Sequence, residues 1–386
     1  MTPDLTKILR CVDCNGKSLS VDATETDDGD VVTGQLTCAD CGATYRIEEG
    51  IAICLPAAMR KVDEDQRKRW FDKREQIERE LIDEDQETYK SRFRDAARSE
   101  GLDESTDGYL WEVRLYEHTV ADFGEHWEQM PERFGISWQR EESGEKDRDD
   151  RALKHLLGRE GSLEGRLVLD AGSGADVYLV RRLQEAGATV VCCDIVPGMI
   201  KHLRRAHELR RKAEGGPRFQ GVCGDLSCLP FRDDVFDHVC CWECIHHVQP
   251  IDRATREVAR ITKPGGAPYV LEVNDQHVFT YPGKIFPRFM KRVIRRGIRR
   301  LFGTERRYLE GSPYEQITPI PAFAASLERS GFRDVGMSVV VHSPGVFPGF
   351  VTRAWEWLAK RLPRVFDPVA MEFILWGKKP ASALRS

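Results

Sequence analysis

The amino-acid sequence predicts an α/β protein in which a mostly parallel sheet follows a small, β-rich metal-binding module and a charged helical segment. Two observations lead to this prediction. From about residue 151, short apolar runs alternate with amphipathic stretches, which is the pattern of strands joined by crossover helices. Near the N-terminus, two tight pairs of cysteines stand in a segment too small for a large core. We therefore expect three regions, 1–58, 59–150 and 151–386, the last with an insertion at 276–320.

The composition favours a water-soluble globular protein. Of the 386 residues, 41% are hydrophobic and 31% charged, and the net charge is −5. No run approaches the roughly 18 apolar residues that a membrane-spanning helix needs. The first residues lack the charged and then apolar segments of a signal peptide. These observations predict a cytoplasmic protein.

The cysteines near the N-terminus have the spacing of a structural metal site. Two Cys-x-x-Cys pairs supply four thiolates, which is the ligand set of tetrahedral zinc. Gly16 and Gly42 follow the second cysteine of each pair, where a tight turn can direct backbone amides at sulfur. The predicted zinc ligands are Cys11, Cys14, Cys38 and Cys41.

Residues 7–58 resemble a known family of small zinc-ribbon proteins. ILRCVDCNGKSL and GQLTCADCGATYRIEEGIAICLP resemble the activators that partner methyltransferases acting on tRNA and translation factors. The sequence departs from that family at Val12, Arg46 and Ala52, where prolines are common. The resemblance implies that the ribbon docks onto a catalytic domain and has no chemistry of its own.

The segment 59–150 is dense in charge and is expected to be mostly helical. Trp70, Ile77 and Leu81 have helical spacing, which predicts a helix that is largely exposed to solvent. Aromatic residues after position 101 suggest packing against a neighbouring element. The run EESGEKDRDD at 141–150 is typical of a solvated linker. We expect this segment to serve as a lid or linker.

The last region has the regular strand–helix alternation of a parallel sheet with right-handed crossovers. Continuous apolar runs such as VVCC and HVCC suit strands that are covered on both faces. The expected strands span 166–172, 189–195, 218–225, 236–244, 267–273, 335–342 and 371–379. The expected helices span 177–186, 198–212, 251–262 and 322–332.

A glycine-rich turn and strand-end carboxylates predict a ligand site at the carboxyl edge of this sheet. In VLDAGSGADVY, Gly172 and Gly174 let the backbone turn sharply and approach a ligand. A dinucleotide fingerprint would need glycine at position 177, which is valine. Asp194 can accept hydrogen bonds from two vicinal hydroxyls, and Asp225 can accept one from an adenine amino group. The candidate cofactor-binding residues are Asp170, Ala171, Gly172, Gly174, Asp194, Ile195, Asp225 and Leu226.

Residues 165–275 resemble the class I S-adenosylmethionine-dependent methyltransferases. The D-x-G-x-G turn is similar to their first motif, and GDLSCLPFRDDVFDHVCCWECIHHV with REVARITKPGG resembles the quinone and small-molecule type. The resemblance implies S-adenosylmethionine as cofactor and a Rossmann-like sheet of seven mostly parallel strands. The family often has glycine where this chain has Asp176, which could instead cap the following helix.

Three residues after the fourth strand are candidates for a general base. Glu243, His246 and His247 can each take a proton, and histidine titrates near neutral pH. A base is needed only if the methyl acceptor must lose a proton. The histidine pair occurs in family members with different acceptors, so a structural part for at least one histidine stays open.

The acceptor should be selected by 59–150 and by the insertion. Within the insertion, residues 286–303 form a basic amphipathic pattern that fits the headgroup surface of a lipid bilayer. Binding to RNA phosphates is a less favoured interpretation. A third interpretation is a lid helix that packs on the sheet domain with its charged face in water. The sequence thus favours a methyltransferase acting on a small-molecule or lipid-like acceptor, with peripheral contact at the inner membrane face. The alternatives are a methyltransferase acting on RNA or protein, and a non-catalytic adapter. Oligomeric state is not predicted.

Overall fold

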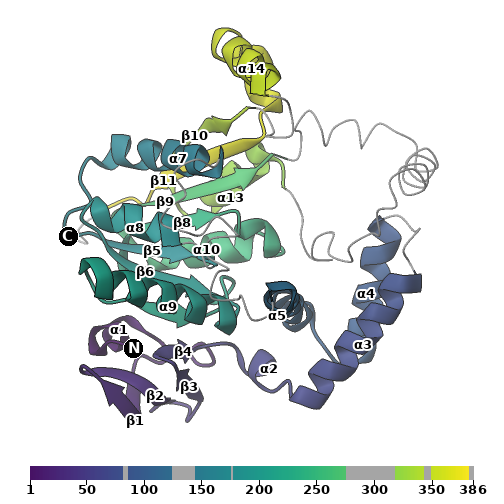
Figure 1. The fold of residues 1–386 in the computed structure, drawn as a ribbon, viewed down its shortest axis with the longest axis vertical. Helices are drawn as coiled ribbons and strands as arrows, with labels where there is room; N and C mark the ends of the chain where they lie inside the picture. Colours follow the sequence, from purple (N-terminus) through teal and green to yellow (C-terminus); the bar gives the residue numbers. More distant parts are fainter. Residues whose placement is uncertain (81–85, 124–143, 175–176, 275–317, 343–348, 382–386) are drawn as a thin grey trace.

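The computed structural model of the chain describes six stretches, and Figure 1 shows how they are arranged. They are residues 1–80, 86–123, 144–174, 177–274, 318–342 and 349–381. Asp176, the basic segment 286–303 and most of the insertion 276–320 lie outside them. Among the helices in these stretches, none has the length and hydropathy that crossing a bilayer requires.

Seven strands build the α/β part of the molecule, one in each predicted span. They are β5 (Leu167–Ala171), β6 (Thr189–Asp194), β7 (Gly221–Cys223), β8 (Phe236–Trp242), β9 (Thr262–Val273), β10 (Arg333–Val341) and β11 (Glu372–Lys378). Strand β7 is shorter than the predicted 218–225, and β9 begins at Thr262, five residues before the predicted start. Their order is β7-β6-β5-β8-β9-β11-β10, with β11 antiparallel to both neighbours. The predicted fold class, a Rossmann-like and mostly parallel sheet, is confirmed.

Helices cover both faces of this sheet, which explains why its strands are apolar on both sides. On one face lie α7 (Gly144–Glu160), α8 (Val177–Glu185) and α9 (Pro197–Glu214); on the other lie α10 (Asp252–Ile261) and α13 (Ile320–Arg329) (Figure 1). Along β5, Val168 packs with the first group, whereas Leu169 packs with the second. The alternation follows from the pleat of the strand.

The N-terminal module does not form a separate sheet. Its strands are β1 (Leu19–Asp27), β2 (Asp30–Cys38), β3 (Thr44–Glu48) and β4 (Ile51–Ile53). Strand β4 pairs in parallel with β7, so that Ala52 lies opposite Val222 and Ile53 opposite Cys223. The described sheet therefore has eleven strands. The expected count of seven is correct only for the α/β part, because the ribbon continues the same sheet.

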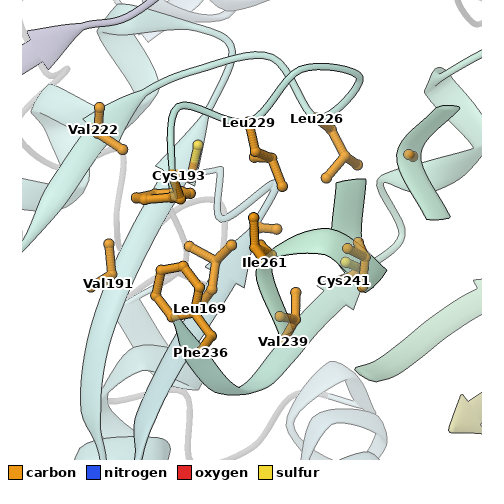
Figure 2. Packing of buried hydrophobic residues seen from close by; sticks show 14 of the residues in the cluster. Leu169, Val191, Cys193, Val222, Leu226, Leu229, Phe236, Val239, Cys241 and Ile261 are labelled. Carbon is orange, nitrogen blue, oxygen red and sulfur yellow. The ribbon is translucent and has the colours of Figure 1, made fainter. Parts of the chain in front are cut away.

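The ribbon and the α/β part also share one hydrophobic core. Leu9, Leu36 and Tyr45 of the ribbon belong to the same buried cluster as Leu169 and Val222. Figure 2 shows the α/β side of this cluster, where side chains from neighbouring strands converge. The guanidinium of Arg10 lies 3.1 Å from the Glu257 carboxylate, and both side chains are largely buried. Removing the ribbon would thus expose apolar core surface and break strand pairing.

The helical segment packs around a small core of its own. It consists of α2 (Ala57–Arg60), α3 (Glu64–Glu80), α4 (Gln86–Ser99) and α5 (Glu104–Phe123). Trp70, Ile77 and Phe93 are buried together, and Trp70 Nε1 donates a hydrogen bond of 2.7 Å to Asp107 Oδ1. The described part of this segment is helical, but Trp70 and Ile77 are buried in a three-helix contact, so the expectation of a largely solvent-exposed helix is wrong for these two residues. Leu81 lies outside the described residues.

The expectation of a solvated linker at 141–150 is wrong for its described end. Helix α7 begins at Gly144, and Asp149 is only 1% exposed. Arg148 Nε lies 3.0 Å from the Asp149 carboxylate. Acidic composition suggested solvent exposure, whereas Arg148 pairs with its neighbour Asp149 and with the distant Glu243, which makes burial possible.

The remaining described elements are short or lie near the C-terminus. They are α1 (Pro3–Ile8), a 3-10 turn η2 (Ile245–His247), α14 (Gly349–Arg361), α15 (Pro363–Phe366) and η3 (Asp367–Val369).

The shared core predicts that ribbon and sheet unfold together. Leu36→Ala removes a fully buried side chain from the ribbon half of that core, so we expect a loss of about 2–5 kcal/mol in unfolding free energy. Thermal unfolding followed by circular dichroism should still show a single transition, at lower temperature. Leu209→Ala, at a side chain 64% exposed, serves as the control and should change little. Two separate transitions in the Leu36 variant would contradict a common core.

Candidate active site

The turn after β5 has a backbone conformation that requires glycine. Gly172 and Gly174 have φ of +74° and +53°, in the left-handed region that favours glycine. A Cβ atom on Gly172 would also fall 2.4 Å from Cβ of Cys244. The Cys244 thiol donates a hydrogen bond of 3.0 Å to the Ala171 carbonyl. The turn is therefore held tightly against the end of β8.

Asp194, at the end of β6, fixes this turn from the neighbouring strand. Its Oδ2 accepts a hydrogen bond of 2.8 Å from the Gly174 amide, and its Oδ1 accepts one of 2.9 Å from the Val196 amide. Burial raises the pKa of Asp194 to about 6. The carboxylate thus remains ionised at neutral pH, with its acceptor capacity shared between backbone and cleft.

Asp225, after β7, is a second buried carboxylate at the same edge. It accepts hydrogen bonds from the Ser227 amide at 2.7 Å and from the Ser227 hydroxyl at 2.8 Å. Burial raises the pKa of Asp225 above its usual range. Successive parallel strands thus place Asp194 and Asp225 beside each other in space.

These elements line a single cleft of about 270 Å³. Six of the eight candidate cofactor-binding residues line it: Gly172, Gly174, Asp194, Ile195, Asp225 and Leu226. The other two, Asp170 and Ala171, are 2% and 0% exposed and lie behind the turn. Their positions suit support of the turn better than direct contact with a ligand.

Helix α5 forms the opposite wall of the cleft, which the sequence did not reveal. Tyr109, Glu112 and Leu115 line the cleft from this helix. The contact is close because Gly198 leaves room for the ring of Tyr116; a Cβ there would lie 2.1 Å from the ring. Tyr109, Glu112 and Tyr116 lie along one face of α5. This spacing alone could not predict the cleft wall, because packed helices without a ligand site have the same spacing.

His247 is the candidate base that faces the cleft. It lines the cavity, and its Nδ1 lies 3.2 Å from Oε1 of Glu112. A carboxylate at that distance can orient the imidazole. The sequence singled out His247 but missed Glu112, because the two residues are far apart in the chain.

His246 takes a different position. Its Nδ1 donates a hydrogen bond of 2.7 Å to Oε2 of the buried Glu272, whose Oε1 accepts the Ile245 amide at 2.9 Å. The rings of His246 and His247 are 4.3 Å apart between centroids. His246 does not belong to the cleft lining in the described residues. Its contacts are those of a residue that supports the histidine beside it.

Glu243 lines the cleft but is held in an ion pair. Its Oε2 lies 2.6 Å from Nη1 of Arg148, on helix α7. Its backbone has a φ of +51°, which is uncommon for a residue other than glycine. The ion pair ties α7 to the end of β8.

The four predicted zinc ligands meet at one point in the ribbon. Their sulfur atoms all lie within 4.8 Å of one another, and the pairs Cys11–Cys41 and Cys14–Cys38 are each 3.6 Å apart. Corners of a tetrahedron with zinc–sulfur bonds of about 2.3 Å are roughly 3.8 Å apart. The Gly16 amide donates a hydrogen bond of 3.3 Å to the Cys14 sulfur, as the turn predicted. The donor set fits zinc.

The cysteine cluster is joined to the start of the helical segment. The Tyr45 hydroxyl lies 3.0 Å from the Cys11 sulfur and donates to Asp13 at 3.2 Å. Asp13 in turn pairs with Arg60 at the end of α2. A change at the cysteines would therefore reach the helices that wall the cleft.

Comparison with known proteins agrees with this arrangement. A family model described as a methyltransferase domain matches residues 169–270, and one described as Trm112p-like protein matches residues 2–50. A demethylmenaquinone methyltransferase from Mycobacterium marinum is 32% identical over 174 residues, covering 44% of this chain and 69% of that protein. The chain belongs to this methyltransferase family. The methyltransferase fold and the Trm112-like ribbon predicted from sequence are both confirmed.

Other relatives match over shorter spans. The UbiE ubiquinone/menaquinone biosynthesis C-methyltransferase of Paracoccus denitrificans is 34% identical, over 30% of this chain and 45% of its own length. The demethylmenaquinone methyltransferase of Streptomyces griseus is 30% identical, over 39% and 62%. The chain thus spans less than two thirds of the length of those relatives. A solved complex of the Haloferax volcanii Trm112 activator with a methyltransferase is 22% identical, covers 61% of this chain and 92% of that one, and has a TM-score of 0.42.

The cysteine geometry predicts about one zinc per chain. Cys11→Ser removes a ligand that the ribbon needs, so we expect loss of the zinc and a lower unfolding temperature. Zinc content measured by mass spectrometry, together with thermal unfolding, checks this. Cys54→Ser is the matched control, since Cys54 is buried nearby but lies outside the four-cysteine cluster, and it should keep its zinc. Retention of zinc by the Cys11 variant would refute the assignment.

Proposed function

We propose that this methyltransferase transfers a methyl group from S-adenosylmethionine to a small, largely apolar acceptor bound in the cleft. One observation carries the proposal: the glycine turn, two strand-end carboxylates, and a histidine with the Glu112 carboxylate beside it all line the same cavity. No other part of the described chain combines these groups.

The residues at the edge of the sheet suit the cofactor. S-adenosylmethionine, when bound, supplies a methyl group that its sulfonium already activates. The bare backbone at Gly172 and Gly174 allows close approach to a ligand. Asp194 offers carboxylate oxygens to paired hydroxyls, and Asp225 with Leu226 offers an acceptor and an apolar surface to an adenine ring.

The cleft lining favours an acceptor with substantial apolar surface. Its apolar side chains come from separate segments: Tyr109 and Leu115 lie on α5, Met199 on α9, Leu229 in the loop after β7 and Val248 just after η2. Apolar walls with a few placed polar groups are typical of small-molecule sites. The named relatives are demethylmenaquinone methyltransferases, so a reduced quinone is the first acceptor to test.

We assign His247 the part of general base and Glu112 that of a positioning residue. His247 would take the proton that the acceptor atom loses as the new bond to carbon forms. Glu112, 3.2 Å from Nδ1, would hold the ring so that Nε2 receives that proton. His246 and Glu243, tied to Glu272 and Arg148, would keep the local backbone in place.

Two other functions remain to be separated by experiment. The ribbon's match to Trm112p-like proteins is the observation that favours an RNA or protein acceptor. A non-catalytic adapter would keep the fold without the cofactor. Calorimetric titration with S-adenosylhomocysteine separates the adapter from both enzymes, and methyl transfer to a reduced quinone or to RNA separates the enzymes from each other.

The raised pKa of Asp194 predicts a pH-dependent affinity for S-adenosylhomocysteine. As pH falls through about 6, Asp194 takes up a proton and loses acceptor capacity, so affinity should be about tenfold weaker at pH 5 than at pH 7.5. Asp194→Asn should bind weakly throughout and without this pH dependence. Asp233→Asn, at an exposed carboxyl outside the cleft, should keep the wild-type profile. Affinity that stays constant between pH 5 and 7.5 would rule out this role.

A second prediction concerns the base. His247→Ala should lower kcat about 10²–10⁴-fold with a reduced quinone while leaving affinity for S-adenosylhomocysteine within about threefold. Glu112→Gln should lower kcat less and shift the pH profile of kcat, because the imidazole loses its anionic partner. His155→Gln, on α7 and outside the cleft lining, is the control. Equal kcat in the His247 variant and the wild type would show that no base at this position is needed.

A further inference from the structure

Helix α14 stands off the body of the molecule beside β10, at the outer border of the sheet (Figure 1). It follows β10, and Figure 1 shows it projecting beyond the sheet. Strand β10 is antiparallel to β11, which is antiparallel to β9, so β10 runs in the same direction as β9. Its carboxyl end therefore lies at the same edge of the sheet as the glycine turn and Asp194.

The outer side of this helix and of α15, which follows it, is apolar and exposed. Trp357 is 54% exposed, Leu362 49% and Val365 63%. Leu358 is also exposed, so four of the seven exposed large hydrophobic side chains in the described residues fall within 357–365. Such a cluster on a folded protein marks an interaction surface.

The inner side of the same segment is packed, so the exposure does not reflect a loose helix. Ala359 is fully buried, and the rings of Trp355 and Phe366 meet edge to face with centroids 5.1 Å apart. His342, at the end of β10, lies 2.9 Å from the Asp367 carboxylate and 3.6 Å from that of Glu356. The segment is thus anchored while Trp357 and Leu362 point outward.

The charges around the exposed apolar residues are positive. The exposed cations of the segment are Arg353, Lys360, Arg361 and Arg364. Its two carboxylates, on Glu356 and Asp367, pair with His342 on the inner side. The Arg361 guanidinium lies 3.7 Å from the centroid of the Trp357 ring. The outward surface therefore combines a tryptophan, aliphatic side chains and a cationic rim.

We propose that this α14 surface, formed by Trp357, Leu358, Leu362 and Val365 with the four cations, docks onto the surface of an anionic lipid bilayer. Tryptophan suits the headgroup region, aliphatic side chains enter the acyl boundary, and arginine and lysine bind lipid phosphates. Leucine and valine at the centre of the surface favour lipid over nucleic acid, for which stacking side chains are expected. The proposal does not depend on which methyl acceptor the cleft takes.

Bilayer docking at this point would orient the whole molecule. Because α14 follows β10, the outermost strand on this side of the sheet, docking would bring the β10 border of the sheet to the membrane.

Vesicle flotation of the full-length protein tests the proposal. Wild type should bind vesicles of phosphatidylcholine with phosphatidylglycerol about tenfold more strongly than pure phosphatidylcholine, and added salt should weaken binding. Trp357→Glu with Leu362→Glu, and separately Arg361→Glu with Arg364→Glu, should each lower bound protein about tenfold. Leu209→Glu is the matched control, since Leu209 is an exposed leucine on α9, and it should bind like wild type.

Several outcomes would overturn the proposal. They are absence of wild-type binding to anionic vesicles, equal binding to both vesicle types, or unchanged binding in the Trp357/Leu362 double variant. Residues 286–303 are the same in every variant, so a loss of binding in the double variant assigns it to the α14 surface. Circular dichroism should show that the variants stay folded. A concentration-dependent dimer in sedimentation velocity that the double variant abolishes would assign the surface to a second copy instead of lipid.

Discussion

The parallel pairing of β5 with β6 and with β8 is the constraint on which the site depends. The registers set Ala171 opposite Cys193 on one side and Cys241 on the other. The turns that follow these strands must then meet at one edge. Once they meet there, the Asp194 carboxylate reaches the Gly174 amide, and Cys244 packs beneath Gly172. The ligand cleft is therefore a consequence of strand register, which brings the turns after neighbouring strands together at one edge of the sheet.

The parts of the fold that the sequence predicted are those with strong local signals. Strands buried on both faces, the glycine turn and the Cys-x-x-Cys pairs can each be recognised from a few consecutive residues. The pairing of β4 with β7 could not be found in that way, because β4 has three residues and its partner lies far along the chain. Arg148 and Asp149 were misjudged since acidic composition says nothing about a distant ion partner such as Glu243.

The site shows the same division. The strand-end residues Gly172, Asp194 and Asp225 were found because parallel topology fixes where strand ends lie. The opposite wall was missed, because nothing in the sequence of α5 states which helix face meets the sheet. Glu112 could be assigned to the site only from the structure, in which its Oε1 lies 3.2 Å from Nδ1 of His247. The structure likewise separates the two adjacent histidines: one faces the cleft, and the other is tied to Glu272.

The joining of ribbon and sheet also decides which strand edges face other molecules. Unpaired backbone at an edge can recruit another chain and start aggregation. Strand β4 covers β7, whose residues Gly221–Cys223 are all buried. The outer edge is instead β1, a largely exposed strand that carries acidic side chains such as Asp22 and Glu25. The ribbon therefore replaces an apolar sheet edge with a negatively charged one, which disfavours edge-to-edge pairing with a second copy of the chain.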